Sequence, residues 1–189
     1  IKQLKTIFQR YLTKEDYREL QTQLYTRIQE GDENPVFPEL LAWVFIQRKD
    51  YTNALRQVKA LDLRLNENGI RILKLGEIAA EDKDYDAAIL AYDYLVEEKG
   101  QTSTLYLDAK RQGLKVRRLK LVEGYTYTNE ELKVLETQYL IFLEEFGYNK
   151  STAPILLELS ELQALYLNEL DKSIELLDGM IALPGVDPP

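Results

Sequence analysis

Three tyrosines recur at a fixed interval, and this recurrence constrains the fold more than any other feature of the sequence. Tyr17, Tyr51 and Tyr85 are 34 residues apart, and the segments that they begin, YRELQTQL, YTNALRQV and YDAAILAY, carry small or apolar residues in matching columns. A fixed period of a few tens of residues is typical of helical solenoids. Between clusters of Gly, Pro and Asn, apolar residues lie three and four positions apart, which favours helices over strands. The chain is therefore predicted to be all-α, with roughly ten helices.

The recurrence divides the chain into predicted units of two helices each. The register gives the units 1–34, 35–68, 69–102, an irregular unit 103–153 and a weaker unit 154–187. We expect these units to form one helical repeat domain over residues 1–189. The chain begins without methionine, inside a predicted helix, and ends in ALPGVDPP, which is a turn and not a capping helix. We therefore expect it to be part of a longer array.

The irregular unit has 51 residues, 17 more than one period. Here we expect a long helix over about 103–122, the loop GYTYTN and a second long helix over about 130–146.

Residue spacing also predicts two N-terminal capping boxes, Thr13 with Asp16 and Thr128 with Glu131. In a capping box, the side chains of the first and fourth residues each hydrogen-bond the backbone of the other residue.

The third unit carries the best match to a known repeat pattern. Its Leu-Gly, Ala and second aromatic columns hold Leu75, Gly76, Ala88 and Tyr92, and the KDY motif at 49–51 recurs at 83–85. In these residues the chain resembles the tetratricopeptide repeat family, most strongly over 35–102. The resemblance implies an α-α superhelix, a right-handed solenoid of antiparallel helix pairs. It also implies a non-catalytic scaffold or adaptor that binds a peptide or a partner helix in its concave groove.

The resemblance places the concave wall of the groove on the first helix of each pair. By register, this wall would hold Glu39, Leu40, Trp43, Ile70, Leu73, Lys74, Glu77, Leu107, Asp108, Arg111, Leu114 and Lys115. Exposed apolar patches mark interaction sites, and the single tryptophan, Trp43, would be a binding anchor. The alternative is that a helix of the same array, such as the one after Glu130, covers the wall in cis. In that case the chain is a structural segment of a larger array.

A basic run on the first helix of the irregular unit is a second candidate for partner binding. It consists of Lys110, Arg111, Lys115, Arg117, Arg118 and Lys120. Arg111, Lys115 and Arg118 share one helix face and could hold carboxylates of a partner. The competing interpretation is a solvated face whose cations pair with acidic neighbours such as Glu144 and Glu145. In the tetratricopeptide family, binding of a partner's C-terminal carboxylate needs an asparagine in the first helix of a unit. The corresponding positions of this chain hold other residues, so that mode of binding is not expected.

The residue types that are missing exclude most catalytic chemistry. The chain has no cysteine and no histidine, so disulfides, thiolate chemistry, the usual zinc sites and imidazole acid–base catalysis are excluded. Paired carboxylates on one helix face, such as Glu77 with Glu81, are the remaining enzymatic alternative, and Gly76 and Gly113 are too isolated to form a phosphate loop. We expect a protein that is not an enzyme and that takes no cofactor and no metal.

Charge and hydropathy restrict the partners. The net charge is -8 and only one unit is basic, which disfavours nucleic acid and anionic membranes. No stretch approaches the roughly 18 apolar residues that span a bilayer, so we expect no membrane insertion. The expected partner is a protein or peptide, and self-association through the repeat ends stays open. The compartment stays open too, cytoplasmic or exported after removal of a signal peptide.

Overall fold

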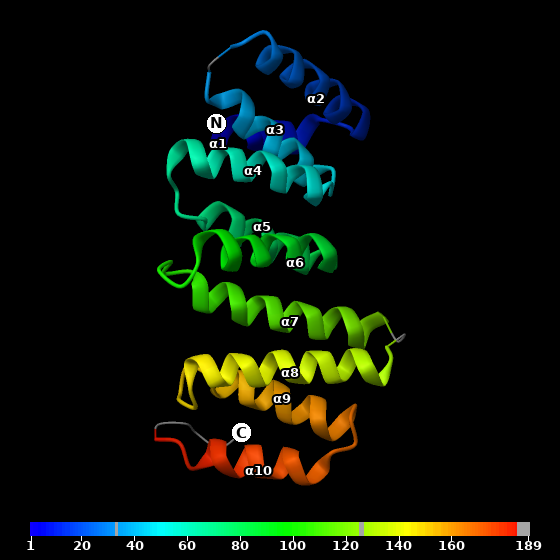
Figure 1. The fold of residues 1–189 in the computed structure, drawn as a ribbon. Coiled ribbons are helices and arrows are strands. Elements are labelled where there is room, and N and C mark those ends of the chain that lie inside the picture. The colour runs from blue at the N-terminus through cyan, green and yellow to red at the C-terminus, as the bar shows by residue number, and fades with distance from the viewer. Residues whose placement is uncertain (33, 125–126, 185–189) are drawn as a thin grey trace. The chain divides into compact units, whose positions relative to one another are not determined.

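The computed structural model describes residues 1–32, 34–124 and 127–184, and across these ranges the chain is all-α, with ten α-helices and no strand (Figure 1). The predictions of an all-α fold and of about ten helices are confirmed. The chain forms two compact units, Ile1–Ala109 and Lys110–Pro189, which we call unit 1 and unit 2 and describe separately. One repeat domain over 1–189, within a longer array, stays a prediction. Residues 125–126 of the expected GYTYTN loop and the last five residues of ALPGVDPP lie outside the described residues.

Unit 1 contains three consecutive helix pairs and the start of a further helix. Its helices are α1 (Lys2–Tyr11), α2 (Lys14–Gln29), α3 (Val36–Gln47), α4 (Tyr51–Leu65), α5 (Ile70–Glu81) and α6 (Tyr85–Tyr94), which continues into a π-helical turn at Leu95–Lys99. From α2 onward each helix of these pairs packs against the next one along the chain (Figure 1). The sequence units 1–34, 35–68 and 69–102 therefore each contain one helix pair.

The KDY motif forms the same turn in the second and third pairs. Lys49 and Lys83 both have a left-handed backbone, with φ of 57° and 65°. The following aspartates, Asp50 and Asp84, cap α4 and α6 by accepting hydrogen bonds from backbone N–H groups three residues on, at 3.3 and 3.1 Å. A left-handed residue ends one helix, and the aspartate that follows it caps the start of the next. The recurrence in sequence is thus a recurrence of turn geometry.

The first pair departs from this pattern at its second helix. The predicted capping box of Thr13 and Asp16 is present, so α2 begins at Lys14, and Tyr17 lies within its first turn. By contrast, Tyr51 and Tyr85 are the first residues of α4 and α6. The 34-residue spacing of the tyrosines therefore does not give them the same position in all three pairs.

The two long helices that the irregular spacing predicts are present, and two helices of ordinary length follow them. Unit 2 contains most of α7 (Tyr106–Gly124), then α8 (Asn129–Phe146), α9 (Ala153–Leu165) and α10 (Leu170–Ile181). The predicted capping box of Thr128 and Glu131 starts α8. Apolar side chains of α8 and α9 form the interior of this unit, with Tyr139, Ile155, Leu159 and Leu162 fully buried. Removing such side chains from water stabilises the unit by about 1.5–3 kcal/mol each.

None of the helices within the described residues is both long and apolar enough to cross a membrane.

Candidate interaction site

The apolar part of the expected wall in unit 1 lies in the interior. Trp43 is 9% exposed, and Leu40 and Leu73 are buried as well. The indole contacts the ring of Phe8 from α1, at a centroid distance of 6.1 Å, and the ring of Tyr17 from α2, edge-on at 5.7 Å. These covering side chains belong to the first helix pair and not to the helix after Glu130. In this structure a partner cannot contact these three residues, because their own chain already does.

The polar residues expected on the same wall remain near the surface. Glu39 is paired with Lys5 of α1 at 2.9 Å. Lys74 and Glu77 are exposed on α5, Ile70 is partly exposed at the start of that helix, and Asp108 and Leu107 are half-buried. Single charges at a protein surface contribute little to binding, whether or not they are paired.

Two cations of the basic run on α7 pair with carboxylates of unit 2. Arg118 pairs with Glu161 of α9 through its Nη2 atom at 2.5 Å, and Lys110 pairs with Glu145 of α8. Arg111 is half-buried, Leu114 is buried, and Lys115 is exposed. The alternative in which the basic run pairs with acidic neighbours is confirmed for Lys110 with Glu145. Lys115 and Lys74 are the exposed basic residues of the expected wall.

A concave basic site that the sequence reasoning missed lies in unit 1, between the start of α2 and the end of α3. Its cavity measures about 390 Å³ and is lined by Leu12, Lys14, Tyr17, Arg18, Gln47, Arg48 and Lys49. We call it the basic pocket. Its residues come from the turn before α2 and the first two turns of that helix, and from the last residue of α3 and the turn that follows it. One signal was present in the sequence, because Lys14 and Arg48 are 34 residues apart and occupy the same column of consecutive units.

Packing on both sides fixes the shape of the basic pocket. The Tyr17 ring lies edge-on against the buried Trp43, so the pocket wall continues directly into the core. The amides of Gln9 and Gln47 bond each other at 3.1 Å and join α1 to α3. Burial raises the pKa of Tyr17, which keeps its hydroxyl neutral. The pocket is therefore held by elements that also carry the interior of unit 1.

The charge of the basic pocket is opposite to that of the chain. Its described lining contains four cations and no carboxylate, whereas the whole chain carries a net charge of -8. Two carboxylates lie close to its cations: Glu15 is 4.0 Å from Arg18, and Asp82 is 3.0 Å from Lys49. Arg48 bonds the neutral amide of Gln21, and Lys14 is exposed at the first position of α2. Such a site can bind carboxylates of a ligand through charge-assisted hydrogen bonds.

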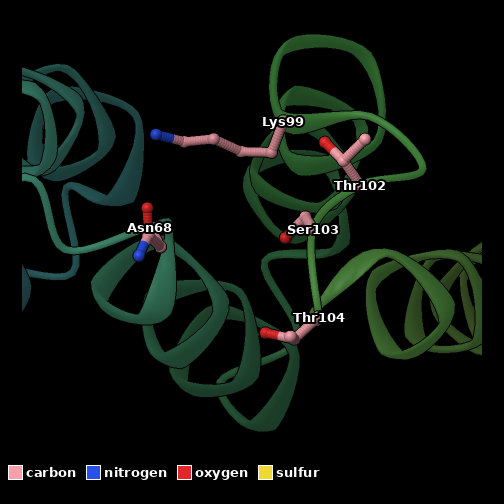
Figure 2. A pocket seen from close by; sticks show the side chains of 5 residues that line it. All are labelled: Asn68, Lys99, Thr102, Ser103 and Thr104. Carbon is pink, nitrogen blue, oxygen red and sulfur yellow. The ribbon is translucent and has the colours of Figure 1, made fainter.

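A second, smaller cavity of about 250 Å³ in unit 1 is lined by Asn68, Lys99, Thr102, Ser103 and Thr104 (Figure 2). Figure 2 shows the Lys99 side chain extending away from Thr102. Its amino group lies 2.6 Å from the fully buried carboxylate of Asp62, which also accepts the Gly69 N–H at 2.6 Å. This hydrogen-bonded pair raises the pKa of Lys99. The cation of this cavity therefore stabilises the fold, because it joins the π-helical turn to Asp62 of α4, which in turn bonds the residue before α5.

Within the described ranges, no group of three or more acidic side chains could hold a metal ion. Comparison of the chain with protein-family models and with curated proteins finds no match. The roles of its residues therefore rest on the contacts and charges given above.

Proposed function

We propose that this chain is a non-catalytic scaffold of tetratricopeptide-like helix pairs that binds an acidic segment of a partner protein in its basic pocket. The observation that carries the proposal is the convergence of four cations, without a carboxylate in the described lining, on one cavity of a strongly acidic chain. A right-handed α-α solenoid is the architecture that we propose for the array.

The repeat architecture is supported by equivalent positions in the second and third pairs. The first helices begin at Val36 and Ile70 and the second helices at Tyr51 and Tyr85, so both starts recur after 34 residues. The connecting turns share their left-handed lysine and their aspartate cap. A helix pair cannot bury its apolar face alone, so pairs of the same geometry stack on their neighbours.

The choice of an acidic segment follows from charge and from the lining. Four cations within one cavity attract carboxylates, and clefts lined by one sign of charge focus the field on their ligands. Leu12 and Tyr17 give the same cavity an apolar wall, which suits an apolar side chain next to the acidic ones. Exposed ion pairs contribute little singly, so affinity would come from several pairs formed at once.

The test measures binding of hexaglutamate to the full chain at low salt, by calorimetry and by the emission of Trp43, which contacts the pocket residue Tyr17. Binding is expected and is expected to weaken as salt is added. The double variant Arg18→Glu with Arg48→Glu should bind at least about tenfold more weakly, because two attractions become repulsions.

The matched control is Lys74→Glu with Lys115→Glu, which makes the same charge change at two exposed residues of the expected wall. This variant should bind like the parent chain. If the control loses binding and the pocket variant keeps it, the wall and not the pocket is the site. If hexaglutamate does not bind the parent chain at low salt, the proposed function is wrong.

The burial of Trp43 favours one alternative. A chain whose apolar wall is covered by its own helices can serve as a structural segment of a larger array, without a ligand in trans. That alternative predicts no binding of hexaglutamate by the parent chain, so the same titration separates the two functions.

A further inference from the structure

The last described helix has a second apolar face, which is exposed. On α10, Leu170, Ile174 and Ile181 are each at least half exposed, and Leu177 between them is half-buried. Their spacing of four, three and four residues places them in one stripe along the helix. The buried residues Ser173 and Met180 lie on another side of α10, which packs against α9. The stripe is therefore additional to the face that holds α10 in unit 2.

The first helix has a comparable stripe. On α1, Ile7 and Tyr11 are more than half exposed, and Leu4 is half-buried, at a spacing of three and four residues. Phe8 contacts Trp43 and so marks the side of the helix that packs inward. As on α10, the exposed stripe is thus distinct from the packed side. Contiguous exposed apolar side chains of this kind mark interaction surfaces.

The charges beside the two stripes are opposite. Helix α1 has three cations, Lys2, Lys5 and Arg10, and no acidic residue. Helix α10 has Asp171, Glu175 and Asp178 and a single lysine, Lys172. Lys5 is paired with Glu39, and Lys172 is paired with Glu169. With about 3.6 residues per helical turn, Arg10 lies beside the stripe of α1, and Asp171 and Asp178 lie beside the stripe of α10, whereas Lys2 lies on the far side of its helix.

We infer that the exposed stripe of α10 in one copy of the chain docks on the exposed stripe of α1 in another copy, so that copies of the chain associate. Charge selects this pairing, because two α10 faces would bring carboxylates together and two α1 faces would bring cations together. The contact joins two different surfaces, so each copy that forms one contact keeps a further face through which a second contact can form. This inference uses neither the basic pocket nor its ligand.

The experiment uses sedimentation velocity of the full chain over a series of concentrations. The mean mass of the parent chain should rise with concentration above that of one copy, and added salt should lower it. Ile7→Gln and Ile174→Gln each place a polar group in one stripe, so each variant alone should stay monomeric where the parent associates. Val134→Gln, at an exposed apolar residue of α8 outside both stripes, is the control and should associate like the parent.

Mixing the two stripe variants gives the decisive result. Ile7→Gln keeps an intact α10 and Ile174→Gln keeps an intact α1, so the mixture should form a one-to-one complex and nothing larger. If Ile7→Gln dimerises alone, two α10 faces pair and the inference is wrong. A parent chain that stays monomeric at every concentration also overturns it. Far-UV circular dichroism and the emission of Trp43 verify that each variant is folded, and retained hexaglutamate binding separates this inference from the proposed function.

Discussion

Gly76 lies so close to the ring of Tyr92 that no side chain fits between them. A Cβ atom on Gly76 would stand 2.8 Å from Cε1 and 2.9 Å from Cζ of Tyr92. The tyrosine is 1% exposed, so its ring has no free space into which it could move. The glycine therefore sets how closely α5 and α6 approach each other. It stands in the small-residue column that the sequence pattern identifies.

Replacing Gly76 by alanine should destabilise unit 1. The clash with a buried ring costs about 1–3 kcal/mol, which exceeds the gain of about 0.5–1 kcal/mol from the higher helix propensity of alanine. Urea unfolding followed by the emission of Trp43 measures the change within unit 1. Gly179→Ala is the matched control, since Gly179 also lies within a helix but a Cβ atom added there would meet nothing within 4 Å. It should stabilise unit 2, and a Gly76→Ala variant of unchanged stability would contradict the close contact.

The aspartate caps give a second prediction about unit 1. Asp84→Ala removes the acceptor of the Ala87 N–H at the start of α6, and the free energy of unfolding should fall by about 1 kcal/mol. Asp84→Asn should restore most of the loss, because asparagine caps helices about as well. Both are measured by urea unfolding with Trp43 emission. Equal losses for alanine and asparagine would assign the effect to the charge and not to the cap.

Local features of the fold could be predicted from the sequence, whereas contacts over long distances could not. The KDY turns and the capping boxes depend on residues that are close in the sequence. Their capping residues therefore lie at helix starts as expected, at Thr13, Asp50, Asp84 and Thr128. The burial of Trp43 depends instead on rings that lie 35 and 26 positions earlier in the chain. The repeat pattern treats the first helices of all pairs as equivalent, so it does not predict that Phe8 and Tyr17 cover Trp43.

The basic pocket was missed for a related reason. Two of its cations lie at the start of α2 and two follow the end of α3, and in the sequence each of these segments is typical of a solvated surface. Only the packing of α2 against α3 brings the four cations to one cavity. Conversely, the basic run on α7 is conspicuous in the sequence, but carboxylates of α8 and α9 already hold two of its cations. Charge clusters along the chain therefore indicate a binding site only when the opposing elements are known.

Unit 2 should show a pH dependence that involves Glu169. Its carboxylate lies 2.5 Å from Lys133 and 3.0 Å from Lys172, and these two hydrogen-bonded lysines lower its pKa to about 2. Glu136 faces the same two lysines, at 3.0 and 3.9 Å. Because the pKa of Glu169 in the folded state lies below its unfolded value of about 4.3, its stabilisation is complete above that value and is lost as the pH falls toward 2.

Glu169→Gln should therefore lower the thermal stability of unit 2 at pH 7, and its difference from the parent should shrink between about pH 4.3 and pH 2. Far-UV circular dichroism follows the thermal unfolding of the whole chain, and the emission of Trp43 identifies the part of that transition that comes from unit 1. Glu175→Gln, at an exposed position of α10, is the control and should match the parent at each pH. A Glu169→Gln difference that persists unchanged at pH 2 would contradict the ion pairs.

Trp43 is the only tryptophan of the chain, so its fluorescence reports on one site. Because its indole is buried against Phe8 and Tyr17, its emission should be blue-shifted and iodide should quench it poorly. Trp43→Ala should lower the free energy of unfolding of unit 1 by about 3–5 kcal/mol, measured by circular dichroism, since the cavity lies between three helices. Trp43→Phe keeps an aromatic ring at this position, so its free energy of unfolding should fall by less. Red-shifted, strongly quenched emission from the parent chain would instead mean that α1 and α2 leave the indole open, and the apolar wall around it would again be the first candidate for partner binding.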